Sequence, residues 1–176
     1  FSVVTIARNN KWKDMLTLYK SDVSNFEDSY MLQYFTGVTL YEQMQNTPQG
    51  YKKDLILTEA QTHLVKATKL LKKGLEKYST DYFTFSSLGT IYVNYLNDVE
   101  SAIPCFEKSL ALNPNYEIAR FNLIFCYDRQ NKTDTAIALY EKMILGGSKY
   151  LPVYFRLHEL YLVKKEFSKA IEFDKK

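Results

Sequence analysis

Apolar residues between Tyr82 and Tyr95 recur at intervals of three and four positions. Phe85, Leu88 and Tyr92 therefore share one face of a helix that is predicted over this range. Gly89 lies on the same side of the helix. Because a glycine costs a helix roughly 1 kcal/mol relative to alanine, we expect another backbone to approach closely at this point.

A second apolar stripe follows, in which Ala102 and Phe106 are four positions apart. Its helix is predicted to end at Asn113 and Pro114. A proline cannot donate a hydrogen bond to the preceding turn, and it biases the residue before it away from helical dihedrals. The two helices form a hairpin over residues 82–114, in which Ala102 and the glycine of the first helix permit close packing.

The same pattern returns twice farther along the chain, at intervals of 34 or 35 residues. The positions that define the repeat are Leu88, Gly89, Tyr92, Ala102, Phe106 and Pro114, then Leu123, Tyr127, Ala136 and Tyr140, then Leu157, Tyr161 and Ala170. A period of about 34 residues with two helices per unit is typical of the tetratricopeptide repeat. The chain resembles tetratricopeptide repeat (TPR) proteins, most clearly over residues 82–176 and in degenerate form over residues 13–81.

This resemblance implies an all-α fold, a right-handed superhelical solenoid of antiparallel helix pairs. The expected hairpins cover residues 82–114, 115–148 and 151–176. The later units depart from the pattern, since Ile124 and His158 occupy the position of the glycine and Gly146-Gly147-Ser148 replaces the proline. The last unit shows no polar capping element, so either further repeats follow it or its end packs on a neighbouring molecule.

The region before the clear repeats, residues 13–81, is predicted to hold degenerate repeat helices. A short helix from Lys13 to Asp22 precedes one from Asp28 to Gln45, with Asn25 as the expected cap between them. A third helix is predicted from Lys52 to Lys77, because the sequence has no helix breaker before the glycine near its end. This helix is unusually long for a repeat hairpin.

Gly37 matches the glycine position of the repeat, and its expected partner lies on the long helix. The best match to the alanine and aromatic positions of a second helix is Ala67 with Leu71. The same helix carries a basic stripe made of Lys66, Lys69, Lys73 and Lys77. The stripe is either a solvated outer face or a contact for anionic lipid heads or an acidic partner. It contains no arginine, and with a net charge of only +3 the chain is not expected to bind nucleic acid.

Residues 1–12 form a lead-in that begins with the apolar run FSVVTIA and ends at the only tryptophan. Two interpretations stay open: the end of a truncated membrane helix, or a segment packed on the domain. The stretch is similar to the segment after the last membrane helix of transmembrane-and-TPR proteins that resemble dolichol-phosphate-mannose-dependent mannosyltransferases. The matching residues are Arg8, Asn9, Trp12, Leu18 and Tyr19. This resemblance implies an extracytoplasmic location beside a membrane; otherwise the chain is expected in the cytoplasm.

The sequence holds no recognisable arrangement for catalysis, a cofactor or a metal ion. His63 and His158 lie far apart and have no cysteine at ligand spacing. Cys105 and Cys126 fall on neighbouring helices, as free thiols or as a disulfide if the domain is extracytoplasmic. The stretch Asn131-Lys132-Thr133 matches the glycosylation acceptor pattern and is equally a good turn and cap between two helices.

Surface recognition is the remaining function. In TPR proteins the first helix of each hairpin lines a concave groove, and the resemblance carries this role over to specific positions. The candidate groove residues are Phe83, Ser86, Thr90, Val93, Ile118, Phe121, Phe125, Asp128, Phe155, Glu159 and Leu162. This surface is apolar and lacks the Lys/Asn/Arg clamp that holds a C-terminal carboxylate in some members of the family.

We therefore expect a non-catalytic interaction module whose unidentified partner is a protein or peptide. The bound segment is a hydrophobic or aromatic peptide, or an apolar segment of the same protein. In the alternative arrangement Phe121 and Phe125 are buried between adjacent hairpins and are not available to a ligand. A second hypothesis is an accessory domain of a polytopic membrane glycosyltransferase-like protein.

Overall fold

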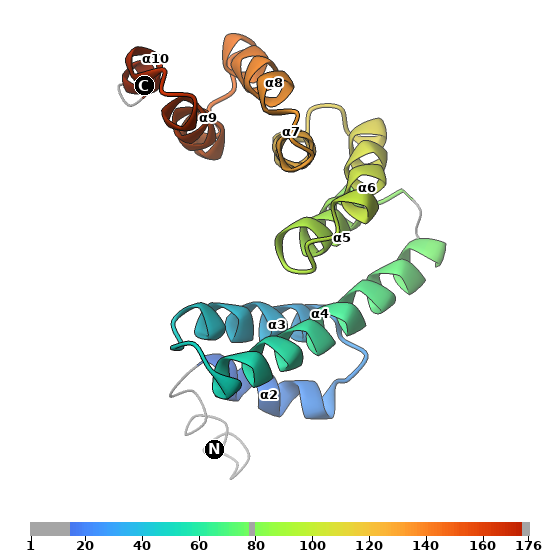
Figure 1. Cartoon of the computed structure of the whole chain (residues 1–176). Coiled ribbons are helices and arrows are strands. Elements are labelled where there is room, and N and C mark those ends of the chain that lie inside the picture. Colours follow the sequence, from blue (N-terminus) through green and yellow to red (C-terminus); the bar gives the residue numbers. More distant parts are fainter. Residues whose placement is uncertain (1–14, 78–79, 174–176) are drawn as a thin grey trace, which may run out of the picture. The chain divides into compact units, whose positions relative to one another are not determined.

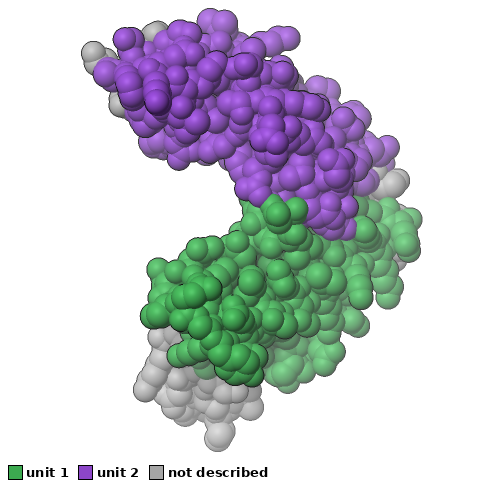
Figure 2. Space-filling model, in the orientation of Figure 1, with its two compact units in different colours: residues 1–79, 94–97 green, residues 80–93, 98–176 purple. Residues whose placement is uncertain are grey.

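The computed structural model describes residues 15–77 and 80–173 of the 176-residue chain. Within these ranges every regular element is a helix, and Figure 1 shows the helices in chain order. The all-α class predicted from the apolar pattern is confirmed. The chain divides into two compact units, residues 1–79 with 94–97 and residues 80–93 with 98–176 (Figure 2).

Unit 1 holds three described helices, of which the middle one packs against both others. They are α2 (Met15–Asn25), α3 (Tyr30–Gln45) and α4 (Tyr51–Lys77). The 27-residue α4 confirms the predicted long helix. On its basic stripe, Lys66 forms an ion pair with Glu27 at 3.0 Å. Of the residues that carry the mannosyltransferase resemblance, Arg8, Asn9 and Trp12 lie outside the described residues.

The cap between α2 and α3 was predicted at the wrong residue. Asn25 is the last residue of α2, and its side-chain amide donates to the carbonyl of Ser21 at 3.0 Å. The helix that follows begins instead after Ser29, whose extended backbone places its hydroxyl to accept from the backbone N–H of Leu32. Both residue types favour helix starts, so composition alone did not separate them.

The prediction that Gly37 faces Ala67 and Leu71 is also wrong. A Cβ atom at Gly37 would lie 2.7 Å from Cγ of Leu64 and 3.0 Å from the carbonyl oxygen of Ala60. The partner pair is therefore Ala60 with Leu64, two turns earlier on α4. Residues seven positions apart lie on nearly the same helix face, and all four of these side chains are buried. The apolar pattern thus gave the correct face of α4 but the wrong level along it.

Unit 2 holds three successive helical hairpins. Their helices are α5 (Tyr82–Asn94), α6 (Val99–Leu112), α7 (Glu117–Arg129), α8 (Thr133–Leu145), α9 (Leu151–Val163) and α10 (Phe167–Phe173). The predicted start of the first of these helices, at Tyr82, agrees with these bounds. None of the described helices combines the length and the apolar character that crossing a membrane requires.

The turn inside each of these three hairpins contains one residue with left-handed backbone. These residues are Asn97, Asn131 and Lys165, each 34 residues from the next, with φ of 54°, 63° and 61°. After Asn131 and Lys165 the next N–H donates to the carbonyl of Tyr127 and of Tyr161, respectively, which closes a Schellman motif at the end of the first helix. The repeat therefore extends to the backbone of the turns, and Asn131 serves as a turn residue.

The first hairpin packs through Gly89, but the neighbour differs from the expected one. A Cβ atom at this position would lie 2.8 Å from the ring of Phe106, so the glycine makes room for an aromatic ring and not for a backbone. Ala102 and Phe106 are fully buried. The Ser109 hydroxyl adds a hydrogen bond of 2.8 Å to the carbonyl of Tyr82, which also joins the two helices.

The second and third hairpins share one apolar core. Its buried members include Ile124, Ala136, Tyr140, Val153, Leu157, Tyr161 and Ala170. His158, at the glycine position of the third hairpin, places its Nδ1 atom 3.1 Å from the carbonyl oxygen of Ala170. A polar contact thus replaces the packing of a small residue at this point.

Candidate binding surfaces of the three hairpins

The first helices of the three hairpins are joined side by side through their groove residues. The Asn122 amide donates to the hydroxyl of Thr90, which links α7 to α5, over a long 3.4 Å. Arg156 on α9 forms an ion pair with Asp128 on α7. We call the surface made by α5, α7 and α9 the first-helix face; its candidate residues are Phe83, Thr90, Ile118, Phe121, Phe125, Asp128, Phe155 and Glu159.

Phe121 is a packing residue of this face. Its half-buried ring lies 5.5 Å from the rings of both Tyr140 and Tyr150, measured between centroids. It is one of the partly buried residues packed against the core of the second and third hairpins. Such ring pairs stabilise a core beyond the area that they bury. For Phe121 the structure thus favours the alternative in which the ring packs between hairpins.

Phe125 lies between two guanidinium groups. The Arg156 guanidinium carbon is 5.2 Å from its ring centroid and that of Arg129 is 6.0 Å away, both within the range of cation–π attraction. The ring is only partly buried. It therefore holds α9 against α7 and leaves little of its surface for a ligand.

Arg156 is the centre of a polar cluster on the first-helix face. Besides Asp128, it pairs with Glu159 at 2.9 Å, and the Thr133 hydroxyl donates to the other Asp128 oxygen at 2.8 Å. Burial lowers the pKa of Arg156, but the hydrogen bonds from its guanidinium to Asp128 and Glu159 outweigh this effect and raise it. Within the described residues its buried Nε has no hydrogen-bond acceptor. Because the charge of Arg156 is neutralised by two carboxylates, the cluster offers no net positive site.

The exposed apolar residues among the groove candidates are Phe83, Ile118, Phe155 and Leu162, at least one from each first helix. Their exposed fractions are 53%, 38%, 68% and 43%. Ser86 and Val93 were expected in the groove as well, but both are buried and are not part of this surface. Ligand contact is therefore available at the four exposed apolar residues, while Phe121, Phe125 and Asp128 hold the helices together.

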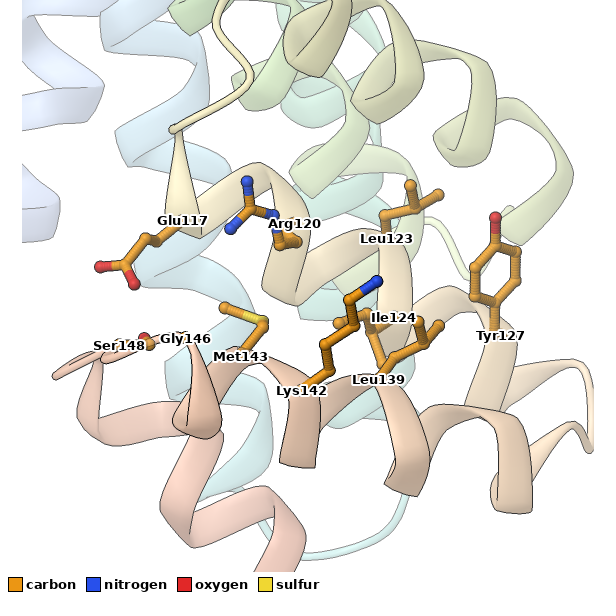
Figure 3. Close-up of a pocket in the computed structure, with 10 residues that line it drawn as sticks. All are labelled: Glu117, Arg120, Leu123, Ile124, Tyr127, Leu139, Lys142, Met143, Gly146 and Ser148. Atoms are coloured by element: carbon orange, nitrogen blue, oxygen red, sulfur yellow. The ribbon is translucent and has the colours of Figure 1, made fainter.

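A second concave site lies between the two helices of the second hairpin, α7 and α8 (Figure 3). It has a volume of about 660 Å³, within the range of small-molecule sites. Its lining residues are Glu117, Arg120, Leu123, Ile124, Tyr127, Leu139, Lys142, Met143, Gly146 and Ser148. We call it the α7–α8 pocket. It shares no lining residue with the first-helix face.

Sequence reasoning missed this pocket, although one signal for it was visible. Ile124 stands 35 residues after Gly89, at the position where a side chain would collide with the Phe106 ring. The isoleucine therefore cannot pack against the second helix of its hairpin in the way that the glycine does. Accordingly Leu123 and Tyr127 are only partly buried, whereas their counterparts Leu88 and Tyr92 are buried.

The remaining candidate residues are the two cysteines and His63. Neither Cys105 nor Cys126 forms a disulfide, and burial raises the pKa of Cys126 to about 12, which keeps its thiol unreactive near neutral pH. The Nδ1 atom of His63 lies 2.7 Å from the buried side-chain oxygen of Gln33, and burial lowers the pKa of this histidine. Among the described residues, no group of three or more His, Cys, Asp and Glu side chains could hold a metal ion.

Comparison with known proteins supports the repeat family. Residues 85–116 match the family model described as tetratricopeptide repeat. A crystal structure of MamA aligns with a TM-score of 0.55 at 21% identity, over 91% of this chain and 77% of that chain. The crystal structure of YrrB, described as a TPR protein with an unusual peptide-binding site, aligns with a TM-score of 0.52 at 15% identity, over 88% of each chain.

The search of curated sequences gave no significant match. The similarity to the solved structures is one of fold, because the identities are low. Together with the family match and the turns that recur every 34 residues, it confirms the predicted solenoid of antiparallel helix pairs. The chain has the fold of a TPR-like helical solenoid, and its residues 85–116 match the tetratricopeptide repeat model.

Proposed function

We propose that the chain is a protein-interaction module that binds an apolar or aromatic peptide segment on its first-helix face. The observation that carries the proposal is the exposure of Phe83, Ile118 and Phe155, so that every first helix presents at least one large apolar side chain. Exposed apolar groups that gather on one face of a protein mark interaction sites. Aromatic side chains in particular provide much of the energy of such contacts.

The charge distribution of the face supports an apolar ligand over an acidic one. Arg156 is paired with Asp128 and Glu159, and the Arg129 guanidinium lies over the Phe125 ring. A carboxylate on a ligand would have to displace these pairings. An apolar side chain needs only to cover the exposed rings. The fold also supports peptide binding, since YrrB, which has this architecture, is described as having a peptide-binding site.

The first experiment selects ligands from a displayed library of random peptides with the full chain as bait. The expected result is a set of sequences rich in aromatic and aliphatic residues, whose binding is lost in the variants Phe83→Ser and Phe155→Ser. These substitutions remove exposed side chains, so the fold is retained. Phe121→Ser is not suitable for this purpose, because its ring packs on Tyr140 and Tyr150.

The matched control is Phe167→Ser. Phe167 is exposed to a similar extent, 58%, but lies on α10, outside the first-helix face. Its variant is expected to bind the selected peptides as tightly as the unchanged chain. Equal loss of binding in Phe155→Ser and Phe167→Ser would show general hydrophobic adhesion and would reject the proposed site.

The hypothesis of an accessory domain beside a membrane rests on residues of which three lie outside the described part of the chain. Leu18 and Tyr19 lie on α2, where the Tyr19 ring stacks on Phe35 at 5.6 Å. This hypothesis is tested by fractionating cells that make the native protein and probing the membrane and soluble fractions. Recovery only in the soluble fraction would rule it out.

A further inference from the structure

We propose that the α7–α8 pocket binds a small amphipathic carboxylate, a single carboxylate joined to an aliphatic chain. This site is separate from the first-helix face and does not depend on the function proposed for that face. On α7, Arg120, Leu123 and Tyr127 follow one another at helical spacing, about half a turn around the helix from Ile118 and Phe125. The same helix thus presents one side to each site.

The polar and apolar groups of the pocket are separated along its length. Figure 3 shows Arg120 on α7 and Lys142 on α8 on opposite walls, between an end formed by Glu117, Gly146 and Ser148 and an end formed by Tyr127. Leu123, Ile124 and Leu139 line the space between Lys142 and Tyr127. A carboxylate at the two cations would therefore place an attached aliphatic chain over these three side chains.

The two cations have donors available for a ligand. Lys142 is exposed, and no carboxylate among the described residues lies within ion-pair distance of its ammonium group. One Nη atom of Arg120 donates to the carbonyl of Pro114, which fixes the side chain at the pocket. A guanidinium carries five N–H donors, so others remain for a carboxylate. Two cations against the single acid Glu117 give the pocket a positive balance.

The first and second hairpins carry different residues at equivalent positions. Lys108 stands 34 residues before Lys142, so a lysine at this position is common to both hairpins. Arg120, by contrast, occupies the position of Phe85, and Ile124 that of Gly89. The second hairpin therefore has a second cation where the first has an aromatic ring, and a branched side chain where the first has a glycine.

The probe for the test is dodecanoate below its micelle-forming concentration, titrated into the full chain with isotope-labelled methyl groups and followed by NMR. The expected result is saturable binding at one site, with shifts at the methyl groups of Leu123, Ile124 and Leu139. Arg120→Gln and Lys142→Gln should each weaken binding about tenfold, which is the loss of affinity expected when one charge-assisted hydrogen bond is removed. Dodecanol, which has the same chain without the charge, should bind at least about tenfold more weakly.

Lys108→Gln is the matched control and should leave the affinity unchanged. The proposal is overturned if dodecanol binds as tightly as dodecanoate, if Lys108→Gln weakens binding as much as Lys142→Gln, or if the shifts lie outside α7 and α8. Absence of saturable binding would overturn it as well. Circular dichroism of each variant verifies the fold. Since Lys142 is exposed, Lys142→Gln keeps the test valid even if Arg120→Gln is destabilised.

Discussion

The first and second hairpins of unit 2 are built on one sequence pattern and differ in how their two helices meet. In the first, Gly89 accepts the Phe106 ring, and the flanking Leu88 and Tyr92 are buried. In the second, Ile124 replaces the glycine, and the residues beside it line a pocket. One position, occupied by glycine or by a branched side chain, thus separates a hairpin that is packed closed from one that has a pocket between its helices.

The largest change in the free energy of unfolding is expected when the equivalent tyrosines of the two hairpins are replaced. Tyr92→Ala removes a buried ring and should lower the free energy of unfolding by about 3 kcal/mol or more, as large-to-small changes in cores do. Tyr127→Ala should cost less than half as much, because Tyr127 is partly exposed at the pocket. Urea denaturation followed by circular dichroism measures both. Equal losses would contradict the difference between the hairpins.

A smaller loss of stability is expected when the glycine of the first hairpin is replaced by the isoleucine of the second. Gly89→Ile forces a side chain against the Phe106 ring and should lower the free energy of unfolding by about 2 kcal/mol through overpacking. The control is Ile124→Val, which removes one methylene group and should cost about 1 kcal/mol. If Gly89→Ile leaves the thermal midpoint unchanged or raises it, the ring does not require the glycine.

The smallest change in stability is expected for the turns, which share a backbone conformation but differ in sequence. Lys165 adopts a left-handed conformation that costs a side chain with a Cβ atom, so Lys165→Gly should raise the free energy of unfolding by about 1 kcal/mol. Asn131→Gly should change it by only a few tenths, because asparagine tolerates this conformation. Thermal unfolding compares the two variants. A destabilising Lys165→Gly would show that the lysine side chain contributes contacts that the turn needs.

The apolar periodicity predicted the helices of unit 2 closely, because each is short and all the turns between them except the last carry glycine, proline or asparagine. It was less informative on α4. There Ala60 with Leu64 and Ala67 with Leu71 repeat after two turns, and only the contact with Gly37 distinguishes them. The apolar pattern shows which side of a helix is buried, but it does not show which turn of the helix contacts a given neighbour.

The candidate sites show the same limit. Helical spacing placed Phe83, Phe121 and Phe155 on one face, but it did not tell an exposed ring from one packed on Tyr140 and Tyr150. The distinction depends on the neighbouring hairpin, which is distant in sequence. Ile124 was recognised as a departure from the repeat, yet its consequence, a pocket beside it, follows only from the three-dimensional spacing of α7 and α8.

The most direct test of the central claim, peptide binding on the first-helix face, is photo-crosslinking of the full-length protein in its native cells. A benzophenone amino acid is placed at position 155 or, as the control, at position 167, both of which hold exposed phenylalanines. The account predicts a crosslinked partner from position 155, joined through an apolar or aromatic segment, and none from position 167. A partner captured only from position 167, or equally from both, would contradict it.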